Sequence, residues 1–281
     1  MSLPLDHLQT WIGREEAADD LVTPRLVEGF RATLAPHLAP VPAGEAPLAL
    51  HWCLAPPMVP EAELGPDGHP ARGGFLPPVP LPRRMWAGGE IETLGPLRIG
   101  DAVRRRSQVA DVAAKEGRTG TLCFVAVRHE LATERGVALR ERHDIVYREA
   151  PQPGSAIPPG EPDPRVPELV WAVPATPVLL FRYSALTFNG HRIHYDEPYV
   201  RAVEGYDGLV VHGPLQASLL LNAAAALGGS VPRRFRYRGL RPMTHGGTFE
   251  VCAAREADGS IAAWTRDADG RACMEAQSTW A

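Results

Sequence analysis

The sequence has few of the features that mark nucleic-acid-binding, metal-binding or membrane-spanning proteins. Among 281 residues lysine occurs once, at Lys115, and the formal net charge is −4, so no basic field is available for a phosphate backbone. The four cysteines form no CxxC pair, which speaks against a zinc or thiol–disulfide motif. The longest apolar stretch, 215–227, contains polar residues and is shorter than the roughly 20 residues of a spanning helix. We therefore expect neither nucleic acid nor a membrane as a partner.

The N-terminal segment 1–20 contains acidic residues and no long apolar run, so it resembles neither a secretory signal nor an Arg-rich transit peptide. Together with the scattered cysteines, this predicts a cytoplasmic protein. Apolar residues make up 44% of the chain and charged residues 22%, which is typical of a packed protein. The length suits two domains of about 100–150 residues each.

A proline-rich segment divides the chain. Nine prolines within 148–177 exclude a helix or a central strand and predict an extended linker. We expect an N-terminal domain at 1–150, a linker at 151–176 and a C-terminal domain at 177–281.

Each half ends in a similar pattern. Three β-rich segments separated by Gly-containing turns are expected before the linker and again after it, near 102–112, 119–131 and 137–147, and near 248–256, 260–266 and 271–280. Each meander follows a Pro-apolar-x-x-Gly segment. The recurrence indicates an internal duplication.

The clearest helix begins after His212. Pro214 suits a first helical turn, and Gly228-Gly229 suits a left-handed stop. Apolar residues lie all around this helix, so a curved sheet should wrap it. A weaker counterpart, 24–34, has apolar residues at helical spacing, and the Pro- and Gly-rich stretch 54–82 is typical of a long loop that shapes a binding site.

Chemically versatile side chains gather in the segment 183–196, directly after an apolar stretch at 178–181 that we interpret as a strand. Two histidines, an asparagine, an arginine and an aspartate fall within 189–196. Together they offer a proton acceptor, an orienting amide and a cation, which a structural loop seldom needs.

This segment resembles the signature of the MaoC-like hydratase family, in which a catalytic Asp and His surround an Asn-Pro-aliphatic-His stretch and a hydrophobic helix follows a His-Gly pair. Aligning Ile193-His194 and His212-Gly213 on that signature places His194 at the catalytic histidine and Asn189 at the catalytic aspartate. An amide cannot accept a proton as a carboxylate does, so a two-residue acid–base scheme lacks one partner.

Where the segment 183–196 differs from that signature, it resembles the mitochondrial-type 3-hydroxyacyl-thioester dehydratase branch. This branch includes mesaconyl-C4-CoA and itaconyl-CoA hydratases. The runs 82–89 and 204–214 and the C-terminal meander also match, so the resemblance spans nearly the whole chain. It implies an α+β double hot-dog, with two curved antiparallel sheets that each wrap a central helix. The C-terminal half then holds the catalytic residues and the N-terminal half forms the acyl pocket.

The resemblance also implies a hydro-lyase that adds water to an enoyl-CoA. His194 would exchange protons with water and with Cα, Asn189 would orient the water, and backbone N–H groups at Gly213 would stabilise the thioester oxygen. No cofactor is expected apart from the CoA of the substrate. A metal is not expected either, because His191-x-x-His194 with Asp196 is completed by no later ligand motif.

We expect a branched C5 dicarboxylic CoA ester, itaconyl-CoA or mesaconyl-C4-CoA, whose product is citramalyl-CoA. A guanidinium could bind its free carboxylate through paired hydrogen bonds, and Arg201 is one further candidate for this. The expected substrate-binding residues are Arg192, Arg84, His191, Trp86 and Phe188.

Several alternatives stay open from the sequence. They are a 3-hydroxyacyl-thioester dehydratase of fatty-acid synthesis, a hot-dog thioesterase, a non-catalytic acyl-CoA binding module and an unrelated interaction protein. The carrier, CoA or acyl carrier protein, is also open. A homodimer is optional, because duplication can build a hot-dog dimer within one chain.

Overall fold

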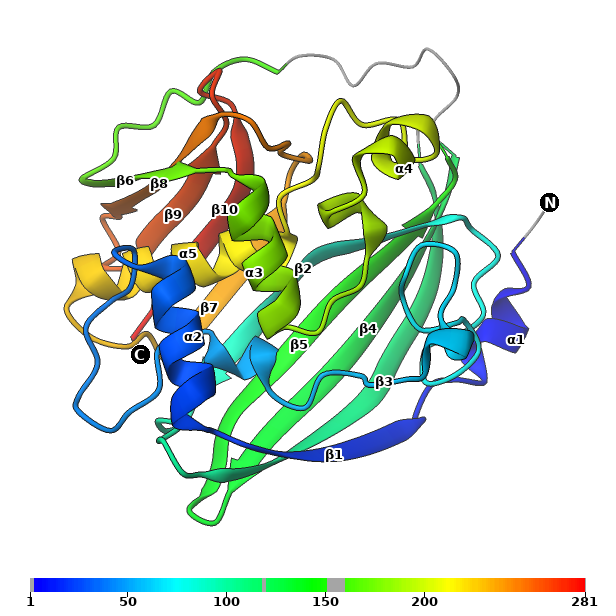
Figure 1. The fold of residues 1–281 in the computed structure, drawn as a ribbon, viewed down its shortest axis with the longest axis horizontal. Helices are drawn as coiled ribbons and strands as arrows, with labels where there is room; N and C mark the ends of the chain where they lie inside the picture. Colours follow the sequence, from blue (N-terminus) through cyan, green and yellow to red (C-terminus); the bar gives the residue numbers. More distant parts are fainter. Residues whose placement is uncertain (1–2, 118–119, 151–159, 281) are drawn as a thin grey trace.

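Ten antiparallel strands form one continuous, curved sheet in the computed structural model, which describes residues 3–117, 120–150 and 160–280 (Figure 1). In spatial order they are β1 (Glu15–Leu21), β3 (Ala102–Gly117), β4 (Gly120–Thr133), β5 (Gly136–Arg148), β2 (Arg83–Thr93), β7 (Arg234–Gly239), β10 (Ala272–Thr279), β9 (Ile261–Arg266), β8 (Thr248–Arg255) and β6 (Leu169–Pro174). The pairing of β2 with β7, from Gly88 opposite Arg238 to Glu92 opposite Arg234, joins the two halves.

Both predicted meanders are confirmed, as β3–β4–β5 and as β8–β9–β10. The expected linker is only partly correct, because 169–174 forms β6 and pairs with β8. This strand lies at the edge of the sheet, the position where proline is tolerated because no ladder hydrogen bond is lost. Residues 151–159 of the expected linker lie outside the described residues.

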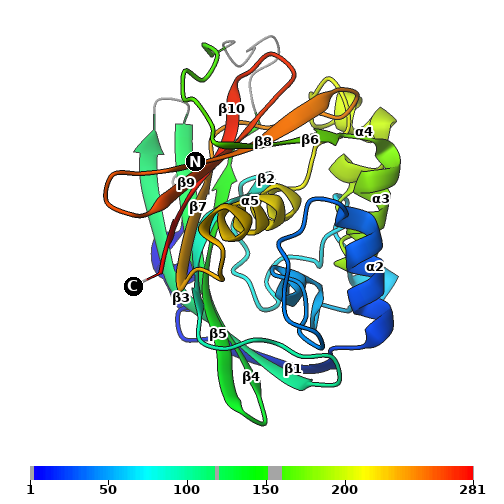
Figure 2. The ribbon, with the colours of Figure 1, turned by 90° about the vertical axis from the view of Figure 1, so that its left-hand side faces the viewer.

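The predicted C-terminal helix is confirmed as α5 (Gly213–Gly228), which ends at Gly229 in the left-handed conformation, with φ of 75°. Strands β8, β9 and β10 pack against it, and Figure 2 shows it inside their concave face. Burying a leucine such as Leu215 or Leu219 contributes roughly 1.5–3 kcal/mol, so this helix anchors the C-terminal half.

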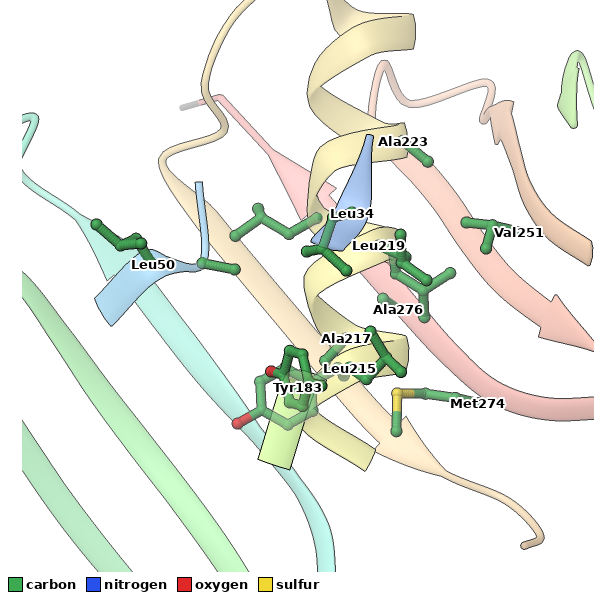
Figure 3. Close-up of a cluster of buried hydrophobic side chains, with 14 of the residues drawn as sticks. Leu34, Leu50, Tyr183, Leu215, Ala217, Leu219, Ala223, Val251, Met274 and Ala276 are labelled. Atoms are coloured by element: carbon green, nitrogen blue, oxygen red, sulfur yellow. The ribbon is translucent and has the colours of Figure 1, made fainter. Parts of the chain in front are cut away.

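The predicted helix of the first half is confirmed as α2 (Pro24–Leu34), and the Thr23 hydroxyl caps it by accepting from Leu26 N–H at 3.1 Å. Its packing differs from the expectation that each sheet wraps a central helix. It lies against α3 and η1 (Leu50–Cys53), and Leu34 joins the apolar cluster around α5 (Figures 2 and 3). Much of the concave face of β3, β4 and β5 is therefore left to line a cavity.

The expectation of a strand at 178–181 is wrong, because this stretch lies in the helix α3 (Pro177–Leu186). The Thr176 hydroxyl accepts from Leu179 N–H at 3.1 Å, and Pro177 occupies the first turn, so the local capping signals outweigh the strand-like composition. The short helices are α1 (Leu5–Gln9), α4 (Glu197–Ala202), η2 (Glu61–Glu63) and η3 (Arg192–His194). Among the described residues, no helix has the length and apolar character that crossing a bilayer requires.

Candidate active site

His194 lies at the end of η3 and is buried, yet it lines the large cavity. Its Nδ1 lies 2.7 Å from the carbonyl oxygen of Val210. A carbonyl can only accept, so Nδ1 carries the proton and Nε2 is left with a lone pair. Burial lowers the pKa of His194 to about 3, and the imidazole is therefore neutral at pH 7.

A second imidazole holds this ring in place. His212 stacks on His194 with centroids 3.6 Å apart and an angle of 18° between the rings. His212 is fully buried and shares a hydrogen bond of 2.8 Å with the Ser184 hydroxyl. Because His212 directly precedes α5, the stacking fixes His194 beside the start of that helix.

The first turn of α5 faces the cavity at Gly213. The N–H groups of a first turn have no partner inside the helix and carry the positive end of its dipole, so they can stabilise negative charge on an oxygen. Trp86 of β2 packs on this turn, and a Cβ on Gly213 would lie 2.6 Å from its Cε3 atom. Only glycine allows both the close packing and the approach of a ligand here.

Asn189 lies in the loop between α3 and η3 and lines the cavity. Its side-chain Oδ1 accepts from the backbone N–H of His191 at 3.0 Å, and the backbone N–H of Asn189 donates to the Ser184 carbonyl at 2.9 Å. These bonds fix the amide and leave its NH₂ group as a donor for a ligand. They do not give it a proton-accepting role.

A segment of the N-terminal half, 65–69, is docked on this loop. The N–H of Arg192 donates to the Asp67 carbonyl at 2.9 Å, and a Cβ on Gly68 would lie 2.0 Å from the Gly190 carbonyl oxygen. The docking places the ring of His69 4.1 Å from that of His191.

Asp67, His69 and His191 then form one cluster. Their ligand-type atoms all lie within 4.8 Å of one another, and Asp67 Oδ2 is 3.0 Å from His69 Nδ1. Burial lowers the pKa of His69 to about 4 and also lowers that of His191. Burial opposes ionisation of Asp67, but its hydrogen bond to His69 and the charge of that ring hold the carboxyl pKa well below its usual range.

One cavity of about 1640 Å³, which both halves line, is bordered by His194, Asn189, Gly213 and the cluster of Asp67, His69 and His191. Towards the concave face of β3, β4 and β5 its wall is mixed, with apolar residues such as Phe124, Val127 and Ile145 beside ionisable ones such as Arg105, Glu141 and His143. Arg84 of β2 also lines the cavity, and it forms no ion pair within the part of the chain that the structure describes.

The model of the hydroxyacyl-thioester dehydratase type 2 family matches residues 49–245. A mesaconyl-C(4)-CoA hydratase from Chloroflexus aurantiacus is 41% identical over 249 residues, which cover 88% of this chain and 89% of the relative. The chain belongs to the hydroxyacyl-thioester dehydratase type 2 family. It is accordingly a lyase of the hydratase and dehydratase class.

More distant matches agree with this family and with the expected fold. A mitochondrial hydroxyacyl-thioester dehydratase type 2 from Schizosaccharomyces pombe is 25% identical over 236 residues, 75% of this chain and 78% of the relative. HtdX of Mycobacterium tuberculosis has a TM-score of 0.67 at 20% identity and covers 95% of this chain and 100% of its own. A second Mycobacterium tuberculosis protein, described as a double hotdog fold, has a TM-score of 0.58 at 13% identity and covers 95% of each chain. The expected double hot-dog architecture is confirmed.

Within this fold, the guanidinium of Arg192 interacts with residues near it and not with the cavity. Its guanidinium pairs with Asp196 at 2.8 Å, donates to the Pro66 carbonyl at 3.0 Å and lies 3.9 Å from the centre of the Tyr199 ring. Arg192 does not line the cavity. Arg201 pairs with Glu197 at 2.8 Å and does not line it either. Of the predicted carboxylate ligands, Arg84 is the one that the fold brings to the cavity.

The remaining predicted residues lie as follows. Trp86 and Phe188 line the cavity, and Phe188 is an exposed residue in a left-handed conformation, with φ of 50°. Asp196 interacts with other groups than His191 and His194: it pairs with Arg192, and it caps α4 by accepting from Tyr199 N–H at 3.1 Å. The histidine pair 191 and 194 therefore does not share Asp196.

The sequence analysis did not identify Asp67 and His69. They lie in the Pro- and Gly-rich stretch that was expected to shape the site, but their separation from His191 along the chain gives no spacing signal. The available signal was the tripeptide Asp67-Gly68-His69, in which a carboxylate and an imidazole flank a glycine. Such a tripeptide also occurs in ordinary turns, so it indicates a functional site only when another segment is known to pack on it.

Proposed function

We propose that this enzyme hydrates a branched C5 dicarboxylic enoyl-CoA, mesaconyl-C4-CoA or itaconyl-CoA, to citramalyl-CoA. The observation that carries the proposal is a neutral imidazole, His194, held in the cavity beside the first turn of α5. The named relative at 41% identity supports the choice of acyl group. No cofactor beyond the CoA of the substrate is part of the proposal.

The geometry supplies each step of a hydration. As the water oxygen bonds to Cβ, its proton passes to Nε2 of His194, and the π electrons move to the thioester oxygen as an enolate. The N–H groups at the start of α5 stabilise that negative charge. The imidazolium then returns a proton to Cα, which restores both the thioester and neutral His194, while the Asn189 amide orients the reacting groups.

Arg84 supports a substrate with a free carboxylate. It lies two residues before Trp86 on β2, so both side chains project to the same face about 7 Å apart, with Trp86 packed on Gly213. Burial, and after it the positive charge of Arg84, lowers the pKa of both His143 on β5 and His69 in the segment 65–69, so Arg84 is near both. A carboxylate next to the reacting double bond would find this guanidinium close by.

The wall of the cavity does not by itself select the acyl chain. Apolar residues such as Phe124, Val127 and Ile145 line it beside Glu141, which accepts hydrogen bonds from Trp52 at 2.9 Å and Tyr237 at 3.1 Å. The choice of a short dicarboxylic acyl group over the intermediates of fatty-acid synthesis is therefore supported by Arg84 and by the relative at 41% identity.

A side-by-side assay of mesaconyl-C4-CoA, itaconyl-CoA and crotonyl-CoA tests the proposal. We expect kcat/KM for a dicarboxylic ester to exceed that for crotonyl-CoA by about tenfold or more, since paired charges in a shielded site are worth at least about 1.4 kcal/mol. A preference for crotonyl-CoA or longer chains would favour the fatty-acid dehydratase, and thiol release without loss of the alkene would favour a thioesterase. Binding without exchange of the Cα proton with solvent would leave only a binding module.

The proposal includes a cytoplasmic location. All four cysteines are unpaired and buried, which supports a reducing compartment.

A further inference from the structure

We propose that Asp67 and His69 of the N-terminal half form a carboxylate–imidazole pair that orients the attacking water, in place of a carboxylate at position 189. The inference rests on the proposed hydratase function and deepens it. In this scheme His194 takes one proton of the attacking water, and His69 Nε2 accepts a hydrogen bond from the other O–H. The water is then held between two imidazoles that come from the two halves of the chain.

The hydrogen bonds of Asp67 define the state of His69. Asp67 Oδ2 lies 3.0 Å from His69 Nδ1, and Oδ1 accepts from the backbone N–H of His69 at 3.1 Å. A carboxylate can only accept, so Nδ1 carries the proton and Nε2 is free to accept. Carboxylate–imidazole pairs orient the base of hydrolase triads in the same way.

Burial suits the pair for this role. The side chains of His69 and Asp67 are 21% and 22% exposed, so they border the cavity without being surrounded by bulk water. The low pKa of Asp67 keeps it ionised, and its charge next to Nδ1–H makes Nε2 of His69 a stronger hydrogen-bond acceptor.

The pair lies on the same cavity as His194, next to His191. His69, His191 and His194 all line the cavity, with ring centroids 4.1 Å apart for the first pair and 5.4 Å for the second. The contacts of segment 65–69 with Gly190 and Arg192 hold this order. The loop that carries His191 and His194 and the segment 65–69 therefore pack as one unit.

The same three residues are of the types that bind a divalent metal, but two observations favour the water-orienting role. Asp67 and His69 already use their facing atoms for a hydrogen bond with each other. The positive charge of Arg84 acts on Asp67, His69 and His191 alike, which disfavours a second cation between them.

Two substitutions of His69 distinguish the role of its Nδ1 from that of its Nε2. His69→Asn keeps a donor near the Nδ1 position, for Asp67, but has no acceptor at the Nε2 position. His69→Gln places an amide oxygen near Nε2. We expect kcat to fall by about 10²-fold or more in His69→Asn and by clearly less in His69→Gln, with small changes in KM. Equal kcat values for wild type and His69→Asn, or a loss confined to KM, would contradict the proposal.

Asp67→Asn tests the tautomer. Its amide can donate to Nδ1, which moves the ring proton to Nε2 and removes the acceptor, so kcat should fall by about 10²-fold or more with an unchanged melting temperature. Asp111→Asn, an exposed carboxylate of β3 outside the cavity, is the matched control and should keep full activity. If Asp67→Asn does not fold, the pair of His69 variants decides.

A metal-content measurement on wild-type enzyme, with activity before and after chelation, completes the test. We expect no dependence on metal. A stoichiometric divalent ion whose removal abolishes turnover would overturn the water-orienting role of the pair in favour of a metal site. Failure of the proposed function itself is distinguishable, because wild-type enzyme would then hydrate none of the three CoA esters.

Discussion

At the scale of single residues, the protonated nitrogen of each histidine decides its chemistry. The Val210 carbonyl fixes the proton of His194 on Nδ1, and the Asp67 carboxylate fixes that of His69 on its own Nδ1. Both rings thus present an acceptor nitrogen, while Asn189 presents an amide. In the proposed mechanism, imidazoles therefore take the place of the carboxylate of the family signature.

Replacing His194 should remove turnover and keep the fold. His194→Ala loses one hydrogen bond to Val210, which contributes about 1 kcal/mol, but it also loses the proposed base. We expect kcat to fall by about 10³-fold with a melting temperature within a few degrees of wild type. Steady-state kinetics and thermal denaturation measure both. Near-normal rates would exclude His194 as the base.

Replacing Arg84 should change substrate preference. Arg84→Met removes the proposed partner of the substrate carboxylate, so kcat/KM for mesaconyl-C4-CoA should fall by about 10–100-fold while that for crotonyl-CoA changes little. Arg201→Met is a suitable control, because Arg201 pairs with Glu197 outside the cavity. Equal losses on both substrates would show that Arg84 supports the fold instead.

At the scale of elements, the start of α5 and the segment 65–69 position the chemistry. Both depend on a glycine that permits a close approach, Gly213 against Trp86 and Gly68 against Gly190. The two elements come from opposite halves of the chain and meet at the cavity. Their relative placement, rather than either element alone, defines the site.

A matched pair of glycine variants tests the docking of segment 65–69. Gly68 and Gly44 both have φ of 84°, but a Cβ on Gly68 would lie 2.0 Å from the Gly190 oxygen, whereas nothing lies within 4 Å of one on Gly44. Each change to Ala should cost about 1–2 kcal/mol of backbone strain. Only Gly68→Ala should also lower kcat, by about 10²-fold, because the segment can no longer dock. Equal activities would contradict the role of the docking.

At the scale of the whole molecule, the fold buries ionisable groups on the concave face where a helix could have packed. Burial lowers the pKa of His51, His143 and His194 to about 3 and that of His69 to about 4. Each histidine titrates near 6.5 in an unfolded chain. Below that pH the unfolded state binds more protons than the folded state, so stability should fall with acidity.

The free energy of unfolding should therefore decrease from about pH 6.5 downwards, towards about pH 4. Each of the four histidines contributes up to about 1.4 kcal/mol per pH unit, and Glu141, whose pKa burial raises, offsets part of this. Urea unfolding between about pH 7 and pH 5 measures the slope. His143→Gln should make the slope shallower by about one histidine's share, and a flat profile would show that these rings are not held neutral.

Much of the fold and one residue of the candidate site could be predicted from the chain itself. The two meanders follow from short-range alternation and turn glycines, α2 and α5 follow from their periodicity and caps, and the segment containing His194 follows from its local density of polar groups. β2, β7 and β6 were not predicted, because they depend on pairing with distant strands. The stretch 178–181 was predicted as a strand because of its apolar composition, whereas the cap at Thr176 indicates the helix α3.

The sequence by itself determined where the local elements lie and placed a histidine and a glycine before a buried helix, since these depend on residues close together in the chain. Only the tertiary structure decided which residues complete the site. The docking of segment 65–69 on the catalytic loop brings Asp67 and His69 to His191, and the pairing of β2 with β7 brings Arg84 and Trp86 to the same cavity. Contacts between segments far apart in the chain leave no periodic or spacing signal in it, because many different separations can produce the same packed surface.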